Sequence, residues 1–63
     1  MNLVKLSIAE RLEKEQLHEA YNLSRACGEF NVSEDIAELM YCPCDEYQEF
    51  RESIIKGLKG EKL

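Results

Sequence analysis

Several features of catalytic, membrane and exported proteins are missing from this chain of 63 residues. It has no tryptophan, one proline and one histidine, and no apolar run approaches the roughly 20 residues of a membrane-spanning helix. The first residues lack the successive charged, apolar and small-residue zones of a secretory signal. The three cysteines are an odd number, which is untypical of a disulfide framework. We therefore expect a cytoplasmic protein with reduced thiols and no membrane segment.

Signatures of catalysis are also missing. The sequence contains no GxSxG turn and no glycine-rich phosphate loop. His18 projects onto the middle of the polar side of its predicted helix, where a solvated side chain is expected. A chain of this length has little capacity to enclose a pocket around an acid and a base. We expect no enzyme activity and no cofactor.

Acidic residues outnumber basic ones, and their distribution is uneven. The formal net charge is −5, from 13 Asp and Glu against 8 Lys and Arg. Residues 34–52 hold seven of the acids and only one base, Arg51. Such a segment repels phosphate backbones and favours a basic partner, although it can also serve simply as a solvated surface.

Helix signals begin near the amino-terminus. Ser7 and Glu10 have the spacing of a capping box, and the chain then runs to Cys27 without glycine or proline. Gly28 follows, where a left-handed residue commonly ends a helix. These signals predict one long helix over about residues 7–27, and residues 1–6 either extend it or form a short strand.

The apolar residues of this predicted helix form two stripes rather than one. The first contains Ile8, Ala9, Leu12, Ala20, Leu23 and Cys27. The second, about a third of a turn away, contains Leu17 and Tyr21, and Leu6 joins it if the helix starts early. A small monomer needs one stripe, so the second indicates either contact with another chain or a helix packed on both sides.

Two shorter helices are predicted after Gly28. Ser33 reads as the N-cap of a helix over about 33–41, with Glu34 and Asp35 in its first turn and an apolar seam of Ile36, Leu39 and Met40. Pro43 suits the first position of a helix over about 43–58, with Cys42 as its cap and Gly60 closing it. Its core stripe is Tyr47, Phe50, Ile54 and Leu58.

These elements predict a single all-α domain over residues 1–63. We expect a small three-helix bundle with a long first, a short second and a medium third helix. A domain of this size buries only about 60% of its unfolded surface, so dimerisation is one way to complete it.

The segment Cys42-Pro43-Cys44 raises the question of a metal site. Structural zinc sites typically pair cysteines two to four residues apart and use four ligands, whereas this pair has one intervening residue and no second pair. A three-cysteine site with Cys27 requires the end of the first helix to meet the start of the third. Asp45 and Glu46 disfavour a reactive thiolate at Cys44. We predict buried or half-buried structural thiols and no metal.

A nucleic-acid role is a second reading. Residues 31–36 superficially resemble the turn and second helix of a helix-turn-helix, but the predicted helix over 33–41 carries three acids and no base. Only Arg11, Lys14 and Arg25 on the first helix could meet phosphates. We do not expect direct nucleic-acid binding.

The sequence most favours a small acidic regulatory or inhibitory module that binds another protein, as an adaptor or as a phage-type inhibitor that occludes a larger target. A homodimer is a further possibility. The predicted anchors are Leu6, Leu17 and Tyr21. The predicted steering surface, the acidic edge, comprises Glu34, Asp35, Glu38, Asp45, Glu46 and Glu49. The alternatives are a helix-turn-helix-like regulator and, third, a zinc-clasped module.

Overall fold

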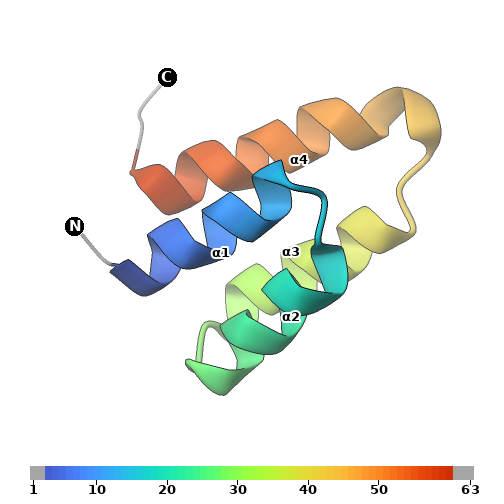
Figure 1. The fold of residues 1–63 in the computed structure, drawn as a ribbon. Coiled ribbons are helices and arrows are strands. Elements are labelled where there is room, and N and C mark those ends of the chain that lie inside the picture. The colour runs from blue at the N-terminus through green and yellow to red at the C-terminus, as the bar shows by residue number, and fades with distance from the viewer. Residues whose placement is uncertain (1–2, 61–63) are drawn as a thin grey trace.

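The computed structural model describes residues 3–60, and these form four helices. Helix α1 spans Leu3–Glu13, α2 Leu17–Ala26, α3 Phe30–Met40 and α4 Cys44–Lys59 (Figure 1). The all-α prediction is confirmed, but the three-helix count is wrong because residues 7–27 form two helices. Residues 3–6 extend α1, while residues 1 and 2 lie outside the described part of the chain.

Successive helices reverse direction, and α4 returns across the molecule to pack against α1 (Figure 1). The closest-packed neighbours are α2 and α3, and the least closely packed are α3 and α4. The radius of gyration of 10.6 Å matches that of a compact 63-residue domain. The four helices therefore form a closed ring of neighbours around one core.

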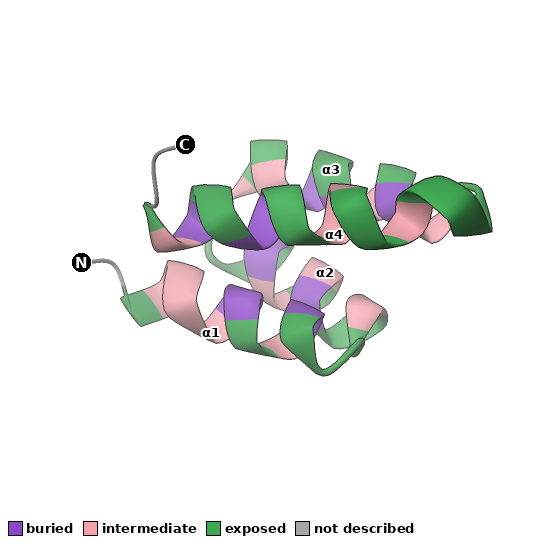
Figure 2. Ribbon diagram, turned by 90° about the horizontal axis from the view of Figure 1, so that it is seen from above, coloured by how far each residue is buried: buried purple, intermediate pink, exposed green. Residues whose placement is uncertain are grey.

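The core takes residues from every helix, and Figure 2 shows their burial on the facing sides of the ribbons. The core stripes predicted within residues 33–58 and most of the first stripe of residues 8–27 are confirmed, with Tyr47 and Phe50 half-buried against the core. Cys27 is the exception, because it is exposed rather than part of the first stripe. The fully and nearly buried apolar residues are Ile8, Ala9, Leu12, Ala20, Ile36, Leu39, Ile54, Ile55 and Leu58.

A tight turn at residues 14–16 divides the predicted long helix. Glu15 has the left-handed φ of 61°. Its N–H donates to the carbonyl of Leu12 at 3.1 Å, and the N–H of Gln16 donates to Arg11 at 2.8 Å. This pair of bonds is the Schellman motif that ends many helices, here with glutamate in the position that glycine usually occupies.

The prediction for Ser33 is also wrong. Helix α3 begins at Phe30, so Ser33 is an interior, buried residue whose hydroxyl donates to the carbonyl of Phe30 at 2.8 Å. Ser24 of α2 is buried in the same way and donates to Tyr21 at 2.7 Å. Each hydroxyl satisfies its hydrogen bond within its own helix, which allows a small polar residue in the core.

Helix α4 matches its prediction closely. Pro43 is the N-cap rather than the first helical residue, so the helix begins one position late, at Cys44. Asp45 and Glu46 lie in the first turn, where they complement the helix dipole. Gly60 ends the helix with the predicted left-handed conformation, φ 74°.

Candidate interaction surface

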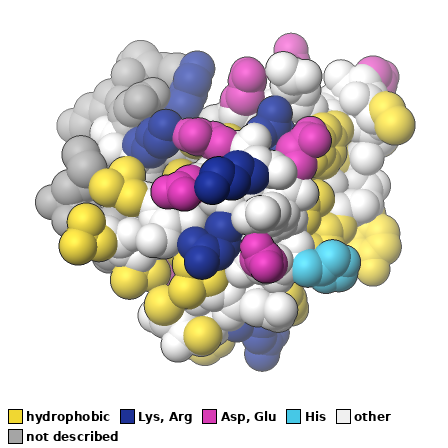
Figure 3. Space-filling model, viewed as in Figure 1, with side chains coloured by type: hydrophobic (Ala, Val, Ile, Leu, Met, Phe, Trp, Pro, Cys, Tyr) yellow, Lys and Arg dark blue, Asp and Glu magenta, His cyan; other side chains and the backbone are white. Residues whose placement is uncertain are grey.

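Among residues 3–60, five basic side chains take part in hydrogen bonds or ion pairs. On the face shown in Figure 3, Lys and Arg alternate with Asp and Glu. These hydrogen bonds and ion pairs lie within α1 or α2, in the turn between them, or between α1 and α4: Arg11 to the Ser7 carbonyl, Lys14 to Glu10, Arg25 to the Tyr21 hydroxyl, Arg51 to the Leu12 carbonyl and Lys59 to Glu13.

The acidic edge lies elsewhere, on α3 and the first half of α4. All six of its carboxylates belong to exposed residues. Within residues 3–60, the ion pairs join Lys14 to Glu10 and Lys59 to Glu13, and none involves the acidic edge. Helix α3 contains three acids and no base. The six carboxylates are therefore not paired with any base of residues 3–60.

Tyr41 is the most exposed large hydrophobic residue described, at 90%. It caps the carboxyl end of α3, directly before Cys42 and Pro43, and between the two halves of the acidic edge in sequence. Sequence reasoning missed it because helical periodicity does not determine the exposure of a residue at a helix end. A tyrosine in this position offers a large, rigid contact surface with a polar tip.

The second apolar stripe is not continuous in the structure. Leu6 lies on α1, whereas Leu17 and Tyr21 lie on α2, beyond the turn at Glu15. Leu17 and Tyr21 are half-buried and pack against the core. The Tyr21 ring also lies 5.8 Å from the guanidinium carbon of Arg25. These residues already contribute to the fold, and their role as partner anchors stays a prediction.

A hollow of about 210 Å³ lies between α3 and α4, with Lys5 of α1 at its side. The apolar side chains of Val32, Phe50 and Ile54 line it, and so do Asp35 and Ser53. A second hollow of about 460 Å³, beside the end of α1, is lined mainly by charged residues. Two of these residues, Glu13 and Lys59, form an ion pair with each other. The charged groups of this second hollow therefore contribute mainly to the contact between α1 and α4.

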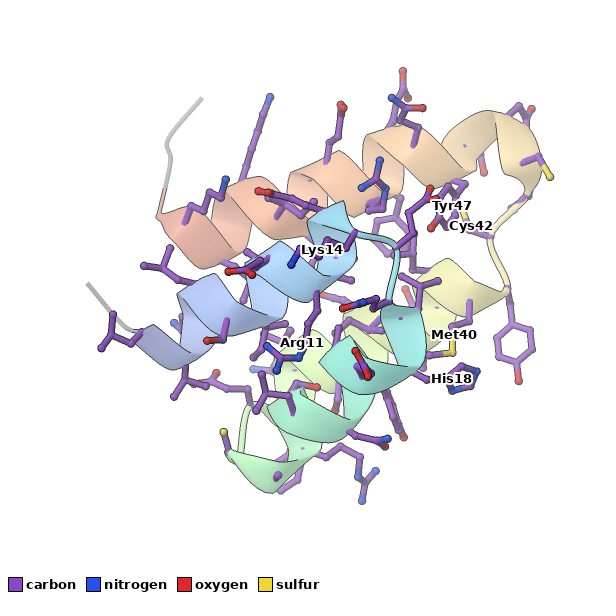
Figure 4. All side chains as sticks on the ribbon, in the orientation of Figure 1. Arg11, Lys14, His18, Met40, Cys42 and Tyr47 are labelled. Carbon is purple, nitrogen blue, oxygen red and sulfur yellow. The ribbon has the colours of Figure 1, made fainter. Side chains whose placement is uncertain are left out.

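The cysteines do not converge. Cys27 follows α2 and Cys42 follows α3, so the 11 residues of α3 separate them by about 16 Å of helix. Figure 4 labels Cys42 at the connection between α3 and α4. No group of three or more metal-binding side chains occurs among residues 3–60. The geometry that a three-cysteine site requires is therefore not formed.

The burial of the cysteine side chains also differs from the prediction. Cys27 and Cys44 are exposed and only Cys42 is half-buried, so the prediction of buried or half-buried thiols is wrong for two of them. Desolvation raises the pKa of the Cys42 thiol, and the carboxylates of Glu46 and Asp45 raise it further. A raised pKa leaves less thiolate and makes this thiol a poorer nucleophile.

The bases expected to meet nucleic acid are spread over two helices and a turn. Arg11 lies on α1, Lys14 in the turn after it and Arg25 near the end of α2; Figure 4 labels the first two. Helices α2 and α3 are joined by three residues that include Gly28, a connection of helix-turn-helix length. The second helix of this pair nevertheless carries only acidic charges.

None of the helices described in residues 3–60 is long and apolar enough to cross a membrane. Comparisons with protein-family models, with curated proteins and with solved structures returned no match.

Proposed function

We propose that this chain is a small regulatory or inhibitory module that binds a basic surface of another protein through its acidic edge. The supporting observation is the separation of charge. Six exposed carboxylates lack ion-pair partners within residues 3–60, while five bases of the same residues, all but Lys5 and Lys56, form hydrogen bonds or ion pairs on and around α1 and α2. A basic partner relieves the mutual repulsion of these carboxylates.

The charges steer the encounter, and an apolar anchor holds the complex. Exposed carboxylates accelerate association with a basic surface and make it sensitive to salt. Tyr41, at the turn between the two acidic helices, supplies the aromatic contact that typically dominates interface energy. In this proposal Tyr41 acts together with the anchors expected from the sequence, Leu6, Leu17 and Tyr21.

Occlusion is the mechanism that suits a molecule of this size. A standard interface buries about 800 Å² on each partner. That is less than a fifth of the 4496 Å² of accessible surface of this chain. The rest of the bound molecule then blocks access of other ligands to the neighbouring surface of the target. This mechanism requires no catalytic activity in the module.

The test compares two variants of equal net charge. Glu34→Gln with Glu38→Gln removes two charges from the acidic edge, and Glu15→Gln with Glu19→Gln removes two from elsewhere. Partners are captured from extracts of the source cells, identified by mass spectrometry, purified, and measured against wild type and both variants. We expect about tenfold weaker binding from the first pair only, which is about 0.7 kcal/mol per charge.

Equal binding by both variants would contradict the role of the acidic edge. Tyr41→Ala tests the anchor separately, and an unchanged dissociation rate would exclude it. Light scattering on the reduced protein tests the competing partner, a second copy. A dimer that Leu17→Asp with Tyr21→Ala dissociates would place a self-interface on α2.

The nucleic-acid alternative predicts that substitutions of basic residues, rather than of the acidic edge, abolish binding. It requires duplex DNA to retain the protein at low salt, and Arg11→Ala with Lys14→Ala to abolish that retention. The acidic-edge proposal expects no retention under the same conditions. The zinc alternative requires a chelator to lower the melting temperature, whereas our proposal expects an unchanged melt.

A further inference from the structure

Gly57 occupies a helical position at which no feature of residues 3–60 requires glycine. It lies inside α4, and it is not among the glycines with positive φ, which are Gly28 and Gly60. A Cβ built on Gly57 meets no atom within 4 Å. After proline, glycine is the least favourable residue for a helix interior. The fold alone would therefore favour alanine at this position.

Gly57 lines the hollow between α3 and α4. Ser53, one turn earlier on α4, lines it too, so the lining contains two small residues together with the apolar Val32 and Phe50. The volume of about 210 Å³ is below the roughly 300–1,000 Å³ typical of small-molecule sites. The hollow is sized for a protruding side chain, and the absent side chain at Gly57 leaves room for a backbone to approach.

Acidic residues flank one end of this hollow on both helices. Asp35 lines it directly, and Glu38 follows three residues later on α3. Glu46 and Glu49 precede Phe50 and Ser53 by four residues, so they continue the same side of α4 toward its amino-terminus. All four acids are exposed. Lys5 of α1 also lines the hollow, so an occupant meets apolar side chains and one base there, and negative charge beyond them along α3 and α4.

We propose that the groove between α3 and α4 receives an amphipathic helix of a partner protein. Its basic residues lie against Asp35, Glu38, Glu46 and Glu49. One large apolar side chain enters the hollow, and its backbone passes close over Gly57. This inference rests on the proposed function and names the chemistry of the partner: a basic amphipathic helix, recognised by its apolar face and its charge.

The test is an NMR titration of the ¹⁵N-labelled chain with two synthetic peptides of equal length. Both carry leucine at i, i+3, i+4 and i+7 spacing, with lysine at the remaining positions of one and glutamate at those of the other. We expect the lysine peptide to shift the amides of Val32, Ser53 and Gly57, and the glutamate peptide to leave them unchanged.

Substitutions at Gly57 separate binding from stability. Gly57→Ala should raise the melting temperature, because alanine favours the helix, and weaken binding of the lysine peptide several-fold. Gly57→Leu should fill the hollow and weaken binding at least tenfold, with its fold checked by the NMR spectrum. The control is Asn22→Ala, at an exposed interior position of α2. It should raise the melting temperature and leave binding unchanged.

The outcomes distinguish this inference from the proposed function. NMR shifts confined to the acidic edge, together with normal binding by Gly57→Leu, would contradict the groove as the binding site. The acidic-edge proposal would remain supported. Equal binding of both peptides would overturn the charge recognition proposed for the groove. Absence of binding by the lysine peptide at low salt would overturn the groove as a site for a basic helix, and the acidic-edge proposal would still be decided by the charge variants and the captured partners.

Discussion

Two turns of this molecule have the same backbone geometry but different residues at their key position. After α1, Glu15 donates to Leu12 and Gln16 to Arg11; after α2, Gly28 donates to Arg25 at 3.1 Å and Glu29 to Ser24 at 2.8 Å. The φ angles, 61° at Glu15 and 78° at Gly28, are both left-handed. Both turns are Schellman motifs, yet only the second is recognisable from its residues.

The difference shows how a turn forms without glycine. Glutamate pays a steric cost in the left-handed region that glycine avoids. At α1 a distant residue supports the turn: Arg51 of α4 donates to the carbonyl of Leu12 at 2.9 Å and to that of Glu13 at 3.4 Å. Its guanidinium thus gives the Leu12 carbonyl a second donor beside the Glu15 N–H, and it also donates to the Glu13 carbonyl at the helix end. The turn at Gly28 uses the conformational freedom of glycine for the same purpose.

Among substitutions that affect the two turns, the loss of Arg51 should reduce the free energy of unfolding most. Arg51→Ala breaks the bonds to the end of α1 and should lower the free energy of unfolding by about 2 kcal/mol. Arg51→Met keeps the apolar stem and also removes the buried, unpartnered Nε, so it should cost less. Urea denaturation followed by circular dichroism measures both.

Arg25→Ala is the matched control, because Arg25 contacts Tyr21 of its own helix. It should change the free energy of unfolding by less than about 0.5 kcal/mol. Equal losses from Arg51→Ala and Arg25→Ala would show that the α1 turn does not depend on α4.

Gly28→Ala should have an intermediate effect. An added Cβ at Gly28 meets no atom within 4 Å, so the cost comes from the left-handed backbone alone. We expect a loss of about 1 kcal/mol in the free energy of unfolding. A neutral substitution, measured by the same denaturation, would mean that the turn shifts to accommodate alanine.

Glu15→Gly should have the smallest effect and the opposite sign. Glycine relieves the left-handed strain but adds conformational freedom to the unfolded chain, which leaves a gain of about 0.5 kcal/mol. The control is Glu19→Gly on α2, which should be destabilising because the site is helical. A loss of stability from Glu15→Gly would contradict the comparison.

Local patterns were enough to predict the all-α class and much of the core. Ile54 and Leu58 follow the predicted stripe of α4, and Gly60 ends that helix as expected. The predicted acidic edge is exposed throughout. Its role in binding stays a prediction, because exposure and charge alone do not identify a partner.

Where the prediction failed, a local signal was absent or ambiguous. Ser33 has good N-cap chemistry, but the same hydroxyl can bond within a helix, as it does to Phe30. The exposure of Tyr41 and the hollow beside Gly57 depend on how α3 meets α4, and no periodicity within one helix describes that contact.

The sequence by itself determined the helical class, the inward stripes and the ends of helices that close on glycine. These depend on neighbouring residues, which interact before any tertiary structure exists. Tertiary structure alone decided that residues 7–27 break at Glu15. The bond that supports this break joins residues 39 positions apart, from Arg51 to the carbonyl of Leu12. It exists only when α4 packs against α1, because only that packing brings the guanidinium to the end of the helix.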